Sequence, residues 1–189
     1  PSRHKKTTVK KIIVQVGRSG ILTPVALLDP VSIGGATISR ATLHNEDELQ
    51  DKDIRQGDKV RVKRAGDVIP EISERIPIPG KKRNEPFHMP RTCPSCRATV
   101  YREGAYSFCP NGLNCPAQQK GKLTHFASRE GLDIQGLHEK TIAAMVDQNI
   151  VSNVADTITG LSPAERHYEY GLQQAGKNTG DRSRNIKIH

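Results

Sequence analysis

The sequence predicts a multidomain chain that combines β and α structure: a small β-barrel, a four-cysteine module, the start of a helical hairpin region and a disordered tail. Short β-branched runs separated by turns fill residues 12–76, and all four cysteines fall within residues 91–119. The spacing of apolar residues becomes helical between residues 123 and 151. With 189 residues, 34% of them hydrophobic and none of them Trp, several modules with thin cores fit better than one large core.

The barrel is expected over residues 12–80, from strands with turn signals about every ten residues. The expected strands cover residues 12–16, 22–28, 31–39 as a pair around Gly34-Gly35, 59–63 and 68–72. Asp29-Pro30 is expected to end the second strand. A helix is expected over residues 39–50, with Ser39 or Thr42 as its cap. About five strands with one inserted helix are the content of an OB-type barrel.

One strand of this barrel, residues 59–63, alternates strictly between cationic and apolar residues. Period-two geometry places Val60 and Val62 in the core. The outward cations are then Lys59, Arg61 and Lys63, with Arg64 at the end of the strand. Aligned cations can follow a phosphate backbone. A solvated edge strand that uses charge to resist aggregation would show the same pattern, so the strand alone favours neither reading.

The charge and the aromatic content together describe the expected partner. The formal net charge is +9 and the isoelectric point about 9.6, which indicates a polyanion such as nucleic acid or an anionic membrane, although a merely soluble basic protein would look similar. Residues 1–86 contain no Phe, Tyr or Trp on which single-stranded bases could stack. A duplex held through its phosphates, with Val68 and Ile69 touching the minor groove, fits better.

The cysteines form a Cys93-x-x-Cys96 pair and a wider pair, Cys109 and Cys115. Two such pairs brought together give a closed tetrahedral Cys₄ site, which predicts a structural Zn²⁺ rather than a catalytic one. Two disulfides or four unliganded thiols are the alternatives. The chain has no secretion signal and no apolar run of about 18 residues, so we expect a cytoplasmic protein with reduced cysteines and no membrane partner.

The zinc module is expected over residues 88–119, and the segments before and after it are expected to have different structures. Residues 77–90 are rich in Pro, Lys and Arg and are expected to be a linker. Residues 120–161 are expected to hold two short helices that meet at a turn containing Gly136, as in a helix-hairpin-helix that binds phosphate through backbone N–H groups. The alternative is an ordinary corner in which Gly caps a helix. Residues 162–189 are polar, and we expect them to be disordered.

Taken in order, five segments resemble the bacterial NAD-dependent DNA ligase family, over roughly residues 1–161. Residues 16–26 (VGRSGILTPVA), 41–45 (ATLHN) and 64–70 (RAGDVIP) look like its barrel motifs. Cys93-Pro94 to Cys115-Pro116-Ala117-Gln118 is similar to its zinc finger, and residues 133–137 (DIQGL) resemble its first hairpin. One such match would be weak, whereas five in the family's order are specific.

The resemblance implies a multidomain, monomeric enzyme that encircles nicked duplex DNA in replication and repair. Such an enzyme is adenylated on a lysine by NAD, passes AMP to the 5′-phosphate and seals the nick with Mg²⁺. By motif position the barrel contacts to DNA would be Arg18, Ser19, Arg64, Val68 and Ile69. The cysteines would hold the structural zinc that joins barrel to hairpin domain, and the adenylation domain of the same polypeptide would be a partner.

Three departures from the family pattern shape the expectations. No Lys-x-Asp-Gly tetrapeptide occurs, so we expect no catalytic or NAD-binding residue here, no activity in isolation, and residues 1–11 as the remnant of an adenylation domain. His138 stands where the hairpin usually has a second Gly, and a non-glycine residue tolerates positive φ poorly. Residues after Leu161 do not resemble further hairpin repeats. The expected location is the bacterial cytoplasm, in association with the nucleoid. The alternative function is a free-standing nucleic-acid-binding module with an OB barrel and a zinc ribbon.

Overall fold

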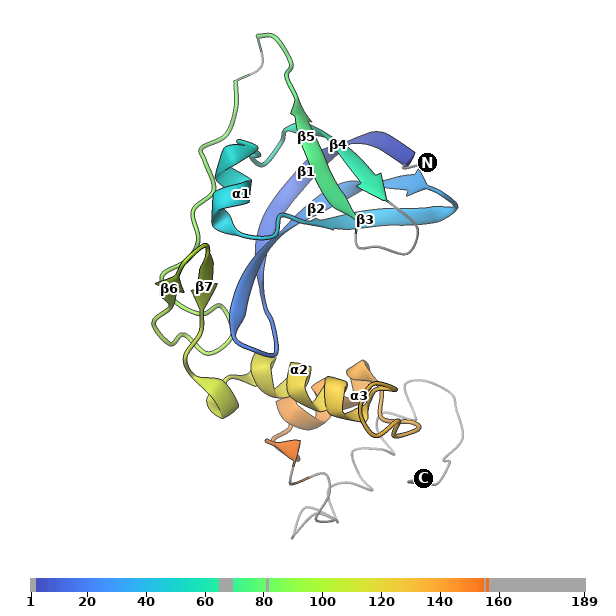
Figure 1. Ribbon diagram of the computed structural model, residues 1–189, viewed down its shortest axis with the longest axis vertical. Coiled ribbons are helices and arrows are strands. Elements are labelled where there is room, and N and C mark those ends of the chain that lie inside the picture. Colours follow the sequence, from blue (N-terminus) through green and yellow to red (C-terminus); the bar gives the residue numbers. More distant parts are fainter. Residues whose placement is uncertain (1–2, 65–69, 81, 155, 157–189) are drawn as a thin grey trace. The chain divides into compact units, whose positions relative to one another are not determined.

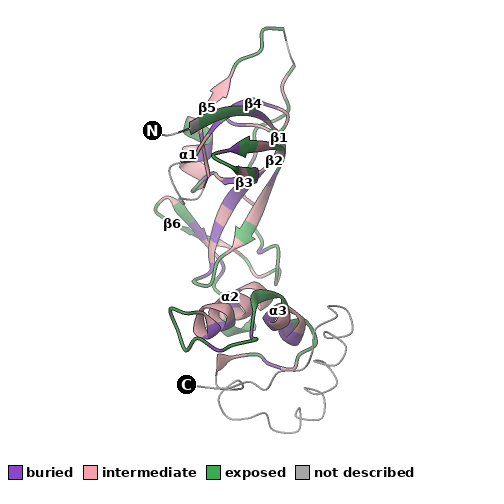
Figure 2. Cartoon of the chain, turned by 90° about the vertical axis from the view of Figure 1, so that its right-hand side faces the viewer, coloured by how far each residue is buried: buried purple, intermediate pink, exposed green. Residues whose placement is uncertain are grey.

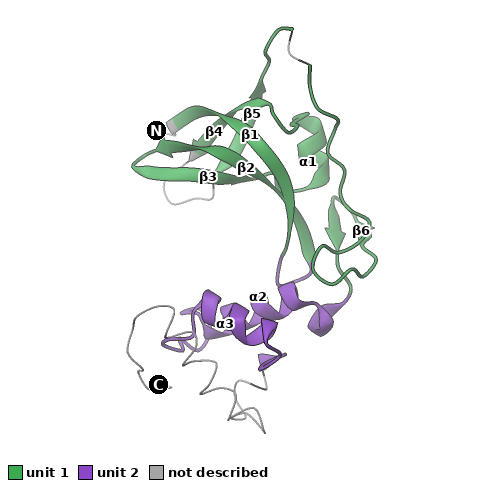
Figure 3. Ribbon diagram, turned by 180° about the vertical axis from the view of Figure 1, so that it is seen from behind, with its two compact units in different colours: residues 1–16, 21–110 green, residues 17–20, 111–189 purple. Residues whose placement is uncertain are grey.

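The computed structural model of the chain describes residues 3–64, 70–80, 82–154 and 156 (Figure 1). The chain forms two compact units, shown in different colours in Figure 3. The first unit holds residues 1–16 and 21–110, and the second holds residues 17–20 and 111–189. The predicted tail, residues 162–189, lies outside the described residues, as do Val68 and Ile69.

Five strands of the first unit form a closed barrel. They are β1 (Arg3–Val16), β2 (Ile21–Ile33), β3 (Ala36–Thr42), β4 (Lys59–Arg64) and β5 (Glu71–Ile76). The strand order is β1-β4-β5-β3-β2, and β1 pairs again with β2 to close the ring. All pairings are antiparallel except β3 with β5, where Thr42 lies opposite Glu71. This closed five-stranded order, with one short helix between β3 and β4, confirms the OB-type barrel.

Several of the expected strand limits are wrong. The third strand, β3, ends at Thr42 rather than Ser39, and the fifth, β5, ends at Ile76 rather than Ile72. The strand β1 begins at Arg3 rather than Ile12, because its first half pairs with β4 while its second half pairs with β2. The strand β2 continues past Pro30 to Ile33. Its register with β3 is irregular between Leu27 and Val31, and such an irregularity is where a sheet tolerates proline. Asp29-Pro30 therefore marks a break in pairing and not the end of the strand.

The expected helix start is also wrong. Ser39 and Thr42 lie in β3, and the helix α1 covers only Glu46–Asp51. Its cap is Asn45, whose side-chain Oδ1 accepts a hydrogen bond from the Glu48 N–H at 2.8 Å. His44, with φ of 59°, turns the chain between the strand and this cap. The acidic residues of the first turn lie where the helix dipole favours negative charge.

The barrel interior is filled by small aliphatic side chains, as the alternation of β4 predicted. Val60 and Val62 of β4 and Ile72 of β5 are completely buried, whereas Lys59 and Arg61 of β4 are exposed; Figure 2 colours the strands by burial. Among the described residues, no aromatic side chain belongs to the buried cluster, but Phe87 packs against it from residues 77–90. The thin core is thus closed partly by a segment that was expected to be a linker.

That segment carries a stretch, residues 83–89, that we call the barrel strap. The Arg83 guanidinium donates to both carboxylate oxygens of Asp58, from Nε at 3.2 Å and from Nη2 at 2.8 Å, and also binds Asp53. Asn84 Nδ2 donates to the Gln56 carbonyl at 2.7 Å. The Met89 N–H donates to the Glu46 carboxylate at 3.3 Å. Residues 83–89 are therefore fixed to the loop after α1 and to α1 itself.

The cysteine-containing segment adds a small hairpin to the same sheet. Its strands are β6 (Tyr101–Glu103) and β7 (Tyr106–Phe108), and β7 pairs with β2 through Ile21 and Phe108. The Arg102 guanidinium binds the carboxylate of Asp47 in α1. A single 3₁₀ turn, η1 (Gly112–Asn114), follows the hairpin.

The second unit is built on two helices, α2 (Pro116–Ala127) and α3 (Glu139–Asp147). Its core includes the completely buried side chains of Leu123 and Ile142. Helix α2 starts at Pro116, earlier than the periodicity from Leu123 indicated, because proline at the first helical position is favourable. The Lys120 and Asp147 side chains form an ion pair between the two helices at 2.5 Å.

In the part of the chain that the structure describes, no helix has both the length and the apolar character needed to cross a bilayer.

Candidate metal centre and nucleic-acid interface

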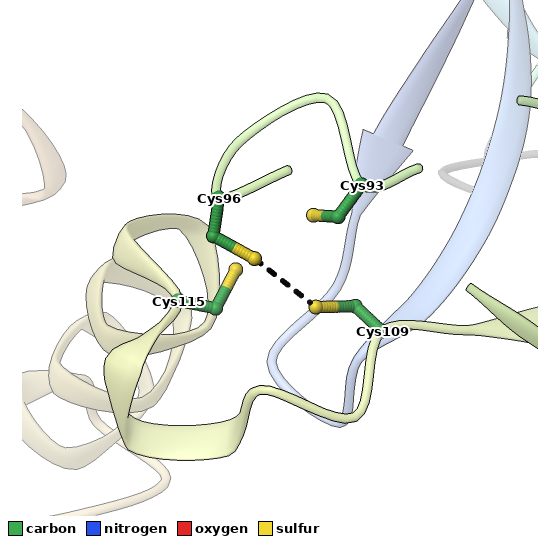
Figure 4. Close-up of side chains that lie close together, drawn as sticks. All are labelled: Cys93, Cys96, Cys109 and Cys115. Carbon is green, nitrogen blue, oxygen red and sulfur yellow. Dashed lines mark hydrogen bonds between the residues drawn. The ribbon is translucent and has the colours of Figure 1, made fainter. Parts of the chain in front are cut away.

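The four cysteines gather their sulfur atoms at one point (Figure 4). All four Sγ atoms lie within 4.8 Å of one another, and those of Cys96 and Cys109 are 3.5 Å apart. A tetrahedral Zn²⁺ with Zn–S bonds of about 2.3 Å would separate its ligand sulfurs by about 3.8 Å. No disulfide joins them, which removes that alternative. The donor set and its spacing fit a structural zinc ion.

Local backbone geometry produces this convergence. The Arg97 N–H donates to the Cys93 carbonyl at 2.9 Å and the Cys93 N–H to the Ala98 carbonyl at 2.8 Å, which closes the Cys-x-x-Cys turn. Arg97 has φ of 63° in this turn. In the second pair, Cys109 follows β7, and Cys115 lies after η1 as the N-cap residue of α2. The four residues thus come from one hydrogen-bonded turn, the end of a strand and the start of a helix.

Burial makes a cation at this point chemically reasonable. Cys93, Cys109 and Cys115 are buried, and Cys96 is half-buried. Burial raises the pKa of the Cys93 thiol, since a thiolate there is poorly solvated without a counter-charge. A metal ion reverses this effect and holds its thiol ligands deprotonated. Four sulfur ligands leave no open position, so such an ion would stabilise the fold and take no part in catalysis.

The loop between β1 and β2 carries two of the predicted DNA contacts, Arg18 and Ser19. Both are exposed. The loop packs on α2 at Gly121, where an added Cβ would lie 3.0 Å from Arg18 Cβ and 3.1 Å from Arg18 Cα. Glycine inside a helix is unfavourable by about 1 kcal/mol relative to alanine, and this close approach supplies a reason for it. The sequence reasoning did not single out Gly121, which lies against the loop that carries these two predicted contacts.

The cationic strand β4 is not an edge strand, because it pairs with β1 on one side and β5 on the other. The aggregation-resistance explanation is therefore wrong. The other explanation, in which the cations of β4 follow a phosphate backbone, now applies to fewer residues, because two of these cations are already paired with carboxylates. Arg61 Nε lies 3.1 Å from the Glu74 carboxylate, and Lys63 Nζ lies 2.5 Å from that of Glu71. The Lys63 ammonium and His44 hold the pKa of the Glu71 carboxyl below its usual range.

Lys59 differs from these two residues. It is exposed, and no carboxylate among residues 3–64, 70–80, 82–154 and 156 forms an ion pair with it. The β1–β4 register places Thr8 opposite Lys59 and Lys6 opposite Arg61. The sequence reasoning missed the cations of β1, although the run His4-Lys5-Lys6 before the first apolar strand was a signal for them.

The turn with Gly136 lies between the two helices of the second unit. Gly136 has φ of 84°, and an added Cβ would meet no atom within 4 Å, so backbone conformation rather than space requires glycine. Helix α2 is capped by Ser128, which contradicts the alternative of Gly136 as a C-cap. His138 has φ of −87° and is the N-cap residue of α3, so its departure from glycine causes no backbone strain.

The third barrel motif is described only in part. Arg64 ends β4 and lies opposite Arg3 in the β1–β4 pairing. Residues 65–69, which include the predicted groove contacts Val68 and Ile69, lie outside the described residues. The prediction that they contact DNA stays a prediction.

Comparison with known proteins gives consistent matches. Residues 6–84 match the model of the NAD-dependent DNA ligase OB-fold domain. A DNA ligase of Haloferax volcanii is 51% identical over 156 residues, 82% of this chain and 22% of the ligase. A DNA ligase of Alkalilimnicola ehrlichii is 46% identical over 183 residues, 96% of this chain and 27% of the ligase. The chain thus spans about a quarter of the length of the curated relatives it matches.

Proposed function

Because the chain belongs to the DNA ligase family and carries an OB-fold domain of the NAD-dependent type, we propose that it is a duplex-DNA-binding segment of a nick-sealing enzyme of replication and repair. The observation that carries this proposal is the closed barrel at residues 3–76, which coincides with the family's OB-fold match at residues 6–84. The sequence relationship continues beyond the barrel through the zinc module and the helices.

Each compact unit carries exposed groups suited to a duplex. In the first unit, Lys6 and Lys59 add positive charge on the outer face of β1 and β4. In the second unit, Arg18 and Ser19 of the β1–β2 loop are exposed. The backbone at Gly136 is not covered by a side chain within 4 Å of where its Cβ would be. These features hold phosphates rather than stack bases, which agrees with the absence of aromatic residues from residues 1–86.

The zinc ion we propose is structural, held by the four cysteines. It would fix the turn at residues 93–97 and the start of α2, in a segment too small to fold on an apolar core. The rest of the chemistry, with NAD as adenylate donor and Mg²⁺ for sealing, belongs to the whole enzyme. This chain has no Lys-x-Asp-Gly motif to accept the adenylate.

Two measurements test this proposal. Fluorescence anisotropy with a labelled nicked duplex should show binding that weakens steeply with added salt, because phosphate contacts release counterions. Incubation with NAD should leave the chain without covalent AMP by intact-mass spectrometry. Duplex affinity that does not change with salt concentration would contradict binding through phosphates. A mass increase of one adenylate would contradict the expected inactivity with NAD.

One observation favours a second candidate, a module for single-stranded nucleic acid. Tyr101 and Tyr106 are 46% and 45% exposed, and Tyr101 stacks on Phe108 with ring centroids 5.4 Å apart. The β6–β7 register places all three rings on one face of the hairpin. If this face stacks bases, single-stranded RNA should bind more tightly than duplex DNA, and Tyr101→Leu should abolish the difference.

A further inference from the structure

The outer face of the barrel, formed by β1, β4 and β5, divides into a neutral part and a positive part. These strands lie side by side in the sheet (Figure 1). On the β5 side, Arg61 and Lys63 are balanced by Glu74 and Glu71. A phosphate approaching there would meet two carboxylates and would have to displace two existing ion pairs.

On the β1 side the charges are not balanced. Lys6 and Lys59 are both exposed, and neither has an ion pair with any described residue. Lys10, further along β1, forms an ion pair with Asp29 at 3.2 Å and so is partly neutralised. Two neighbouring ammonium groups without counter-charges repel each other weakly in water and gain from a shared anion.

The strand register brings these two lysines to one place. Thr8 lies directly opposite Lys59, and Lys6 is two residues from Thr8 along β1 on the same face. Diagonal neighbours across an antiparallel pair are separated by about 7–8 Å, within reach of two flexible lysine side chains. The Thr8 hydroxyl between them is half-exposed and offers a hydrogen-bond donor.

We propose that Lys6, Thr8 and Lys59 form a phosphate-binding site for the backbone of duplex DNA, while Arg61 and Lys63 serve the barrel as internal ion pairs. This proposal rests on the proposed function, because it takes the duplex as the anion. It assigns the electrostatic contact with DNA to the paired strands β1 and β4. Of the three cations that the alternation of β4 had placed in contact with DNA, it keeps Lys59 and removes Arg61 and Lys63.

The test compares matched double variants of the full chain. Lys6→Gln/Lys59→Gln should lower the magnitude of the slope of log K against log salt by about 0.9, since the two lysines together neutralise one phosphate. Arg61→Gln/Lys63→Gln should leave that slope unchanged. Thr8→Val should weaken binding without changing the slope, since it removes a hydrogen bond and no charge.

The outcomes separate the two proposals. If the unsubstituted chain shows no salt-dependent duplex binding, both fail. If it binds and Lys6→Gln/Lys59→Gln keeps the original slope, the phosphate site is overturned and the proposed function stands. A slope lowered equally by Arg61→Gln/Lys63→Gln also overturns the site. Circular dichroism should show the same thermal unfolding for Lys6→Gln/Lys59→Gln and the unsubstituted chain, because both side chains are exposed.

Discussion

The Arg83→Ala substitution tests whether the barrel strap contributes to the stability of the first unit. Arg83 donates two hydrogen bonds to the Asp58 carboxylate and two to Asp53, one to its carboxylate and one to its backbone carbonyl. The Asp58 side chain is 9% exposed, and without Arg83 it keeps a hydrogen bond from the Arg55 N–H at 3.0 Å. The substitution therefore leaves a nearly buried carboxylate with one partner and without its counter-charge.

The magnitude follows from this exposure. Removing one partner of a fully buried ion pair costs about 3–5 kcal/mol. Asp53 is 43% exposed and Arg83 24% exposed, so solvent screens part of the interaction and we expect about 2 kcal/mol. For a domain of about 100 residues this lowers Tm by about 8 °C or more. Thermal unfolding followed by far-ultraviolet circular dichroism measures the shift.

A matched control is Arg75→Ala. Arg75 Nη2 lies 4.0 Å from Asp53 Oδ2, and its side chain is 28% exposed, close to the value for Arg83. It should change Tm by less than half as much. Equal Tm values for Arg83→Ala and the unsubstituted chain would refute this prediction, because the contacts of the barrel strap would then contribute nothing to the free energy of unfolding.

The strap also predicts a pH dependence. The hydrogen bond from Arg83 is the largest cause that holds the pKa of Asp53 below its usual value of about 3.8. A carboxyl whose pKa is lowered on folding adds stability above its unfolded pKa, and this stability is lost as the pH falls through the folded pKa. The stability difference between the unsubstituted chain and Arg83→Ala should therefore shrink below about pH 4.

Three other substitutions have defined outcomes. Cys109→Ser should lower bound zinc, measured by mass spectrometry of the metal, from one ion per chain to less than half, and an unchanged content would remove Cys109 from the ligand set. Gly121→Ala should weaken duplex binding, because the new Cβ meets Arg18 at 3.0 Å; Lys122→Ala, which adds no atom, should bind normally. Lys63→Gln should flatten the loss of stability below about pH 4.5, since Lys63 is the main cause of the lowered Glu71 pKa; an unaltered acid titration would contradict this.

Features governed by local pattern were predictable from the sequence. The alternation of Val60 and Val62 placed both in the core, and the spacing of the cysteines predicted that their sulfurs would converge. Gly136 was correctly placed in a turn because its conformation is set within a few residues. Where the spacing of apolar residues matches the repeat of a strand or helix, the local sequence is enough to predict which residues are buried.

Features governed by distant partners were not predictable in this way. Residues 83–89 have no periodicity, and their structure comes from Asp53 and Asp58, 30 and 25 residues away. The first half of β1 consists largely of Lys and Thr, and it is a strand because β4 pairs with it. The ion pairs of Arg61 and Lys63 depend on the register of β5, which the sequence of β4 alone does not contain.

The relative affinity for duplex and single strand tests the central claim most directly. The full zinc-loaded chain would be titrated into a labelled nicked duplex in competition with unlabelled single-stranded DNA and RNA of equal length, at fixed salt. A barrel that binds phosphates and has no aromatic residues on which bases could stack should prefer the duplex, so the single strands should compete poorly. If single-stranded DNA or RNA displaces the duplex at lower concentration than unlabelled duplex does, the account of this chain as a duplex-binding ligase segment is contradicted.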